Sequence, residues 1–282
     1  MTAVRGRLLT LGMLAPALAF VLGVIAYPLA TALWFSLTSV QIGGAGHFVG
    51  LANYSFLFGL GTYGDAVRDT VVYTAGSTAL KAVFGLLLAF SLARPFPGRR
   101  IVYAVLFLPF IFPADMGAVA WYYLLSNVHG GINYLIQRDV AWLGTGPLAM
   151  ASLITVNVWH GTALFTVLVL AALRSVPGNL VDAAVIDGAR WYQRFLRIVL
   201  PYLVPGLALA ALLSVLGTFG DFVFVYLITG GGPANSTSIV GTMAFEVGLL
   251  NGDLGLASAI SFSVIPVYLI GLVYLLRLVA GR

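Results

Sequence analysis

The sequence has 282 residues, of which 61% are hydrophobic and 8% charged, with a mean hydropathy of +1.03 and a formal net charge of +5. Soluble globular domains carry about 25% charged residues, so this composition excludes that class and indicates a polytopic membrane protein. The chain contains no cysteine, which excludes disulfides, thiolate metal sites and thiol catalysis.

The first apolar run extends from residue 8 to 37 without a charge and follows a basic flank that contains Arg5 and Arg7. A basic flank is also typical of a secretory signal peptide, but the apolar core of a signal is only about 7–15 residues long. The longer run therefore predicts an uncleaved first membrane span.

Further apolar windows reach the length of about 20 residues that a helix needs to cross a bilayer. The predicted spans cover residues 8–37, 70–93, 101–125, 148–173, 201–228 and 255–277. Pro109 and Pro113 predict a kink in the third span. The sequence thus predicts an all-α membrane protein with six transmembrane helices.

Basic residues predict the orientation of these spans. Eleven of the fourteen Lys and Arg residues lie at the two ends of the chain and in the connections 94–100 and 174–197. Because positive residues concentrate on the cytoplasmic side, both termini and these connections are expected to be cytoplasmic. No segment between spans is long enough for a separate domain, so residues 1–282 are expected to form a single membrane domain. Nucleic-acid binding is not expected, since the arginines only flank apolar runs.

Polar residues recur on one face of the fourth and of the fifth predicted span, at helical spacing. The face of the fourth span comprises Asn157 and His160 together with Gly161 and Leu164, and the face of the fifth comprises Ser214, Thr218 and Asp221. Two such faces turned toward each other predict a hydrophilic path, whereas the alternative is that the polar groups hold helices together by hydrogen bonds. Lys81 and Asp115 also lie within spans, either as an ion pair or as part of the lining of the path.

The most hydrophilic stretch lies between the fourth and fifth spans, at about residues 174–200, and we call it the hydrophilic segment. Pro177 suits the first turn of a helix, Asn179 is a candidate cap, and Gly188 is a natural helix stop. A second helix over residues 189–200 would separate an aromatic face from an arginine face. One interpretation is a helix at the membrane surface, with its arginines on lipid phosphates.

No set of residues suggests catalysis. The histidines His47, His129 and His160 lack metal-ligand spacing, and the chain has no phosphate-binding loop and no plausible pair of catalytic carboxylates. Energy for active transport would have to come from an ion gradient or from a partner chain.

The stretch "VDAAVIDGARWYQRFLRIVLPYLVP" resembles the EAA loop of permease subunits in binding-protein-dependent ABC importers. The residues that match the family pattern are Asp182, Ala183, Ala184, Asp187, Gly188, Ala189, Phe195, Ile198, Leu200 and Pro201. The departure is Asp182, where the family usually has glutamate. In that family this loop forms a coupling helix that docks into a cleft of the ATPase subunit.

Four other stretches extend the resemblance to permeases of the maltose and glycerol-3-phosphate type: "FVGLANYSFL", "LPFIFPADMGAVAWYYLL", "GGINYLI" and "YLITGGGP". The resemblance implies a type I importer permease in a bacterial or archaeal cell (inner) membrane, without catalytic residues, metal or cofactor of its own. Its implied partners are a second homologous permease, two ATPase subunits that bind ATP and Mg, an extracytoplasmic solute-binding protein, a carbohydrate solute and membrane lipid.

The resemblance also implies roles for named residues. Coupling to the ATPase is expected of Asp182, Ala183, Ala184, Asp187 and Gly188, and contact with the sugar is expected of the polar faces of the fourth and fifth spans. Two alternatives remain from the residues alone: a gradient-driven transporter that uses Asp115 and Asp221 for ion coupling, and an assembly protein without a path. The sequence leaves open which sugar is carried.

Overall fold

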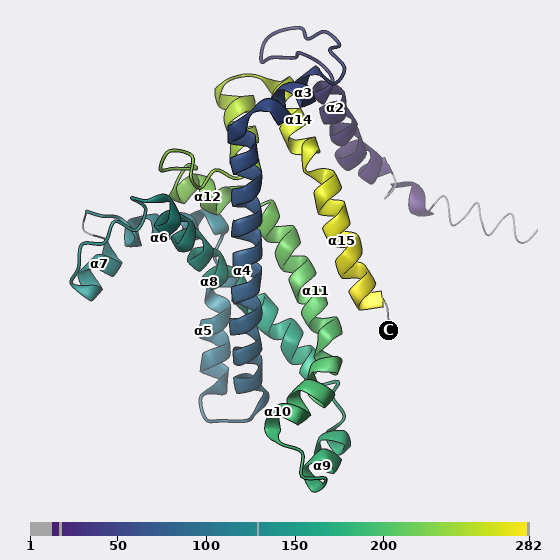
Figure 1. Ribbon diagram of the computed structural model, residues 1–282, viewed down its shortest axis with the longest axis vertical. Helices are drawn as coiled ribbons and strands as arrows, with labels where there is room; N and C mark the ends of the chain where they lie inside the picture. Colours follow the sequence, from purple (N-terminus) through teal and green to yellow (C-terminus); the bar gives the residue numbers. More distant parts are fainter. Residues whose placement is uncertain (1–12, 17–18, 129, 281–282) are drawn as a thin grey trace, which may run out of the picture. The chain divides into compact units, whose positions relative to one another are not determined.

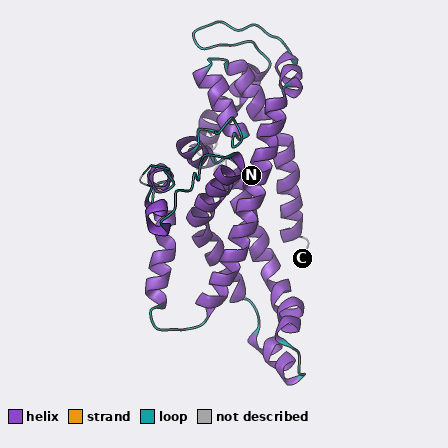
Figure 2. Ribbon diagram, turned by 60° about the vertical axis from the view of Figure 1, so that its left-hand side comes forward, coloured by secondary structure: helices purple, strands orange, loops and turns teal. Residues whose placement is uncertain are grey.

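The computed structural model describes residues 13–16, 19–128 and 130–280. Regular structure in these residues is helical, and extended pairing is limited to the isolated bridges Thr38–Phe48 and Gln41–Asp253 (Figure 2). The predicted all-α class is confirmed. Arg5, Arg7, His129 and Arg282, which entered the predictions above, lie outside the described residues.

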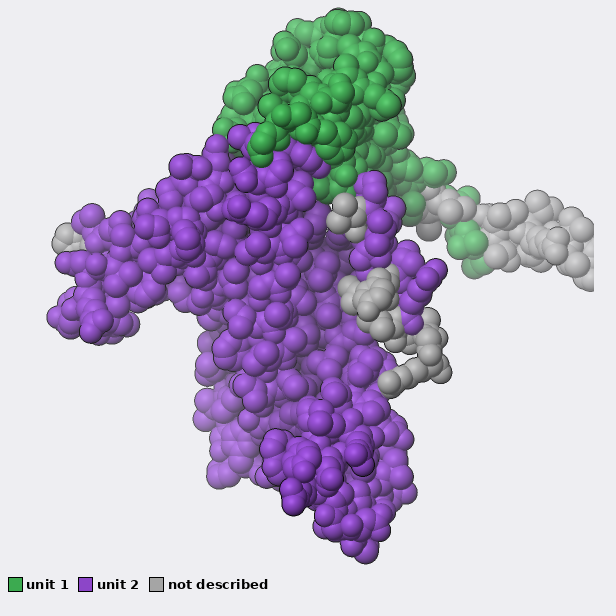
Figure 3. Space-filling view, viewed as in Figure 1, with its two compact units in different colours: residues 1–61, 243–265 green, residues 62–242, 266–282 purple. Residues whose placement is uncertain are grey.

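The chain divides into two compact units (Figure 3). Unit 1 comprises residues 1–61 and 243–265, and unit 2 comprises residues 62–242 and 266–282. Each unit is described separately below. The expectation of a single membrane domain over residues 1–282 stays a prediction.

Unit 1 is organised around α14, which packs against α2 and α3. The helices of this unit are η1 (Leu22–Ala26), α2 (Tyr27–Ser36), α3 (Ala52–Gly59), η3 (Glu246–Leu250) and α14 (Leu254–Ser263). The side-chain amide of Asn53 donates to the carbonyls of Ser36 and Thr38, each at 2.9 Å, and so ties α3 to the end of α2. Asp253 caps α14 by accepting from the backbone N–H of Leu256 at 2.8 Å.

Unit 2 contains the longer helices (Figure 1). Its elements are α4 (Gly61–Ala93), α5 (Arg99–Ile111), α6 (Ala114–Leu124), α7 (Gly131–Ile136), α8 (Gly146–Leu173), α9 (Gly178–Ile186), α10 (Trp191–Arg194), η2 (Phe195–Val199), α11 (Leu200–Phe219) and α12 (Phe222–Ile228). Helices α13 (Val240–Phe245) and α15 (Ile265–Ala280) cross the boundaries between the units.

Within the described residues, five helices are long and apolar enough to cross a membrane, or six if the bent pair α5 and α6 counts as one span. The predicted set of several membrane-spanning helices is therefore confirmed. The side of the membrane on which the termini lie stays a prediction.

The third predicted span, residues 101–125, is a broken helix. Helices α5 and α6 meet at an angle of 98°. Helix α5 ends at Ile111, and Phe112 and Pro113 adopt extended backbone with ψ angles of 135° and 137°. Because proline disfavours the α conformation of the residue before it, Pro113 explains why the helix stops there. The predicted kink is confirmed and is larger than a bend within one helix.

The second predicted span begins too late in the sequence. The window started at residue 70, whereas α4 begins at Gly61. The additional turns contain charges that neutralise one another: the guanidinium of Arg68 bonds Oδ1 of Asp69 at 3.0 and 3.1 Å and approaches Asp65 to 3.9 Å. A hydropathy window therefore excludes these turns although their backbone is helical.

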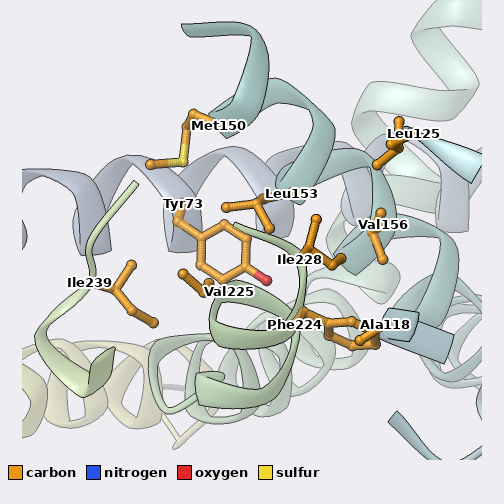
Figure 4. Close-up of a cluster of buried hydrophobic side chains, with 10 residues drawn as sticks. All are labelled: Tyr73, Ala118, Leu125, Met150, Leu153, Val156, Phe224, Val225, Ile228 and Ile239. Carbon is orange, nitrogen blue, oxygen red and sulfur yellow. The ribbon is translucent and has the colours of Figure 1, made fainter. Parts of the chain in front are cut away.

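Among the described membrane-spanning helices, α8 is the most buried. In its apolar stretch 56% is buried, against at most 28% in the other helices. One apolar cluster joins α8 to α4, α6 and α12 (Figure 4), and a second joins it to α4 and α11. The first comprises Tyr73, Ala118, Leu125, Met150, Leu153, Val156, Phe224, Val225, Ile228 and Ile239, and the second Ala89, Leu92, Phe165, Val169, Leu170 and Ala210. Helix α8 thus holds the other helices of unit 2 around it.

Candidate functional site

A cavity of about 290 Å³ lies within unit 2, lined by residues of α4, α5, α6, α8, α11 and α12. We call it the polar cavity. Its volume is close to the lower end of the range of about 300–1,000 Å³ that is usual for small-molecule sites. The residues predicted to line a path all border it: Asn157, His160, Gly161, Leu164, Ser214, Thr218 and Asp221. The remaining wall consists of Lys81, Phe110, Ala114, Phe165, Ala210, Leu213, Gly217 and Phe224.

The polar face of α8 is placed as its spacing predicts. Asn157, His160, Gly161 and Leu164 lie on one continuous helix, so positions i, i+3, i+4 and i+7 all reach the same side. The His160 ring stands edge-on to the ring of Phe224, with centroids 5.1 Å apart. This face therefore combines polar groups with an aromatic surface.

The polar face of the fifth span differs from the prediction, because Asp221 does not belong to the same helix as Ser214 and Thr218. Helix α11 ends at Phe219, and Asp221 is the N-cap of α12, where its Oδ1 accepts from the backbone N–H of Phe224 at 3.3 Å. Glycine, as at Gly220, is among the residues that destabilise a helix most, and aspartate is among the preferred N-caps. The break therefore has a local cause. Asp221 still reaches the polar cavity, from the start of a new helix.

Hydrogen bonds connect Asp221 to two other helices. Its Oδ2 accepts from the hydroxyl of Tyr73 on α4 at 2.6 Å and from the amide of Asn157 on α8 at 2.8 Å. Asn157 in turn accepts from the hydroxyl of Thr218 on α11 at 3.3 Å. Four helices thus meet around one carboxylate, whose acceptor capacity is largely used by the chain itself.

Lys81 enters the same network from α4. Its ammonium donates to the hydroxyl of Thr218 at 3.0 Å and to that of Ser214 at 3.4 Å, and Ser214 also bonds the hydroxyl of Thr78 at 3.0 Å. Gly161 leaves room for this arrangement, since a Cβ at that position would lie against the end of the Lys81 side chain. One cation and one carboxylate therefore border the polar cavity, with neutral groups between them.

The alternative of an ion pair between Lys81 and Asp115 is not what the structure shows. Lys81 is 5% exposed and bonds α11, whereas Asp115 is exposed in the first turn of α6. A carboxylate in the first turn of a helix interacts favourably with the helix dipole, which is a sufficient reason for Asp115 to be there. Of the two roles considered for Lys81, lining the cavity is the one that fits.

The sequence interpretation missed the contribution of α4. Buried polar residues follow one another along that helix at spacings of three and four: Thr70, Tyr73, Thr74, Ser77 and Lys81. This spacing is the same signal that identified the faces of α8 and the fifth span. Applied to residues 70–93, it would have added Tyr73, which bonds Asp221 at the cavity, to Lys81, which was already a candidate for the lining.

The hydrophilic segment folds into α9, a turn, and the short helix α10, which continues through η2 into α11. Gly188 has a φ angle of 75°, and the N–H groups of Gly188 and Ala189 donate to the carbonyls of Val185 and Ala184 at 3.0 and 2.9 Å. This is a Schellman turn, in which a left-handed residue closes the helix end. The prediction that Gly188 stops the first helix is confirmed.

Several details of the hydrophilic segment were predicted wrongly. Asn179 lies inside α9, whose N-cap is Pro177, and the second helix begins at Trp191 rather than at residue 189. Asp182 lies mid-helix and Asp187 is the C-cap of α9, and the ion pairs among the described residues do not include either of them. Their carboxylates are exposed, which leaves them free of the chain's own cations.

No residue of α9 or α10 is buried. Ile186 is 86% exposed and Trp191 is 73% exposed, and Asp182, Ala183, Asp187 and Gly188 are exposed as well. Large apolar side chains next to exposed carboxylates are typical of a surface that another molecule covers. The five residues predicted to couple to a partner, of which only Ala184 is half-buried, thus lie together in the second half of α9 and the turn that follows it.

Comparisons with known proteins identify the family of this chain. A family model described as "Binding-protein-dependent transport system inner membrane component" matches residues 81–280. The trehalose/maltose transport system permease protein MalF of Thermococcus litoralis is 33% identical over 254 residues, which are 88% of this chain and 86% of that protein.

Two solved structures share the fold. A chain of a bacterial ABC transporter involved in the import of the acidic polysaccharide alginate superposes with a TM-score of 0.85 at 19% identity, covering 99% of this chain and 98% of that chain. A second structure, of the bacterial alginate ABC transporter in complex with alginate pentasaccharide-bound periplasmic protein, gives a TM-score of 0.82 at 20% identity, covering 97% and 94% of the two chains.

Proposed function

The chain belongs to the family of binding-protein-dependent transport system inner membrane components, and on that premise we propose that it forms half of a translocation path for a sugar or sugar-like solute. The family is one of transport permeases, not of catalysts. Membership decides against the two alternatives left by the residues alone, a gradient-driven transporter and an assembly protein without a path.

The polar cavity is the observation that carries the proposed path. Hydroxyl, amide, imidazole and ammonium groups gather there inside an otherwise apolar helix bundle, where polar groups are costly unless they are bonded or wet. A solute rich in hydroxyl groups can both donate to and accept from such a lining. The solutes named for the relatives, trehalose, maltose and alginate, are all of that chemical class.

We assign different roles to the residues that border the cavity. Asn157, Thr218 and Asp221 bond one another and neighbouring helices, so they hold the cavity in shape. His160, Gly161, Leu164 and Ser214 are part-exposed and are the groups that we expect to meet the solute.

The hydrophilic segment is the proposed contact with an ATPase subunit. Helix α9 presents Asp182, Ala183 and Ala184, and the turn presents Asp187 and Gly188, with few contacts of their own to hold them. Hydrolysis of ATP with Mg would take place in two such partner subunits. A second permease would complete the path, and an extracytoplasmic binding protein would deliver the solute.

The experiment is reconstitution of the chain with its partner subunits in proteoliposomes. Concentrative uptake should require ATP inside the vesicles and a solute-loaded binding protein outside. Concentrative uptake by the chain alone would contradict the proposal. The solute class is tested by loading the binding protein with a neutral disaccharide, an acidic oligosaccharide or an amino acid, and measuring which of them stimulates ATP hydrolysis.

A further inference from the structure

Three arginines surround a second pocket in unit 2, away from the polar cavity. Arg99 and Arg100 form the first turn of α5, and Arg174 directly follows α8. With Phe96, Ile101 and Tyr103 they line a hollow of about 690 Å³, which we call the arginine pocket. It lies where the connection 94–98 joins α4 to α5, at the same end of unit 2 as α9 and α10 (Figure 1).

Among the described residues, no carboxylate forms an ion pair with these guanidinium groups. The pocket lining contains no Asp or Glu, and the ion pairs among the described residues involve only Arg68 with Asp65 and Asp69. Three like charges around one hollow repel each other, and an anion in the hollow would relieve that repulsion. The charge of the arginine pocket therefore points to an anionic ligand.

Arg99 gives an independent indication of a missing acceptor. Its guanidinium lies over the ring of Tyr103, 5.4 Å from the centroid, and one terminal nitrogen donates to the Tyr103 hydroxyl at 3.2 Å. The Nε of the same group is buried and has no hydrogen-bond partner. A buried charged donor without an acceptor is costly, and guanidinium groups bind phosphate oxygens through paired N–H groups. The Arg99 side chain is thus held in place, and its Nε–H group can still donate a hydrogen bond to a ligand.

The position of the pocket and its apolar walls indicate which kind of anion it would bind. The arginines stand at the ends of two apolar helices, α5 and α8, which is the level of lipid headgroups for helices that cross a bilayer. Ile101 is 70% exposed and Phe96 is 38% exposed beside the charges. Basic pockets between transmembrane helices bind the headgroups of anionic lipids, and apolar side chains beside the charges suit an acyl chain.

We propose that the arginine pocket binds the phosphate group of an anionic membrane lipid. Arg99 and Arg174 hold the phosphate from two sides, Arg100 adds charge, and Phe96 and Ile101 contact the first part of the lipid chains. Free inorganic phosphate would offer the arginines the same oxygen atoms, so the test has to distinguish a lipid phosphate from free phosphate.

The test uses the full-length chain purified with its partner subunits in nanodiscs of phosphatidylcholine, with or without phosphatidylglycerol. Native mass spectrometry should detect phosphatidylglycerol that stays bound after the bulk lipid is removed. Arg174→Gln should weaken this binding about fivefold, since one basic residue near a membrane surface contributes that factor. Arg99→Lys, which keeps the charge but loses the fork of donors, should weaken it as well.

The matched control is Arg94→Gln, because Arg94 is exposed in the same connection but does not line the pocket. Equal loss of lipid in Arg94→Gln and Arg174→Gln would overturn the proposal in favour of a general basic surface. Displacement of the lipid by inorganic phosphate at millimolar concentration would overturn the lipid as the source. Assembly of each variant in phosphatidylcholine alone, measured by size-exclusion chromatography, shows that the variant is folded before lipid binding is compared.

Discussion

The polar cavity and the hydrophilic segment are two polar regions of unit 2, and they are held in opposite ways. Around the cavity, Asn157, Thr218 and Lys81 are 5%, 2% and 5% exposed, and each bonds a residue of another helix. In α9 and α10 no residue is buried, and the shape of the turn is fixed by backbone hydrogen bonds. Side-chain positions are thus set by contacts between helices in the first region and are not fixed by such burial in the second.

This difference determines which measurement a mutation should change first. A change in the cavity network removes bonds between helices, so it should lower stability before it alters anything else. A change at the exposed residues of α9 and of the Gly188 turn removes little tertiary contact, so it should leave stability largely intact and alter mainly the proposed coupling to a partner.

The strongest test of the cavity side is Asp221→Ala. The substitution leaves the buried donors of Tyr73 and Asn157 without an acceptor and removes the cap of α12, which together should cost about 3–5 kcal/mol. We expect a lower melting temperature and a lower yield of assembled complex, measured by fluorescence-detected size-exclusion chromatography after heating. Asp115→Ala is the control, since Asp115 is exposed, and equal melting temperatures of the two variants would show that the network does not hold the helices.

The hydrophilic segment is tested by Gly188→Leu. A leucine at a φ angle of 75° should cost about 1–2 kcal/mol, although a Cβ there would meet no atom within 4 Å. Because an exposed turn can relax or open locally without unfolding the helix bundle, we expect little change in the melting temperature of the bundle, with uptake uncoupled from ATP hydrolysis. Gly188→Asn should keep coupling, because asparagine tolerates the left-handed conformation. Normal uptake in Gly188→Leu would remove the turn from the coupling contact.

The smallest effect is expected for a change at Thr218, which tests whether this residue is structural or contacts the solute. Thr218→Val keeps the shape of the side chain but deletes the bonds to Lys81 and Asn157, at about 0.5–1.5 kcal/mol. We expect a modest fall in melting temperature with little change in uptake per assembled complex. Thr155→Val is the control, because Thr155 is exposed on α8 and bonds only its own helix. Reduced uptake at an unchanged melting temperature would instead place Thr218 in contact with the solute.

Periodicity predicted the cavity residues well where the helix is continuous. On α8 the spacing of Asn157 to Leu164 was sufficient, because a rigid helix converts sequence spacing into direction. Asp221 was assigned to the right cavity for an incorrect reason, since the helix breaks at Gly220 and the side chain arrives as a cap. A helix end depends on local competition between caps and helix bonds, which a spacing rule does not include.

The sequence could not predict which residues that are far apart in the chain bond to each other. Tyr73 and Asp221 are 148 residues apart, and nothing in either neighbourhood identifies the other as its partner. Lys81 was recognised as unusual but was given the wrong candidate partner, because both Lys81 and Asp115 were known only to lie within spans. The hydrophilic segment was easier to predict, since its Schellman turn depends on residues within one helix turn of Gly188.

The length of α4 has a mechanical consequence. The helix runs for 33 residues, about 50 Å, and Lys81 is bonded to α11 part of the way along it. About 30 Å of helix extend from Lys81 toward Gly61 and about 18 Å toward Ala93, so α4 is a lever with unequal arms about that contact. Any tilt of α4 about Lys81 would move the Gly61 end farther than the Ala93 end, and in the opposite direction.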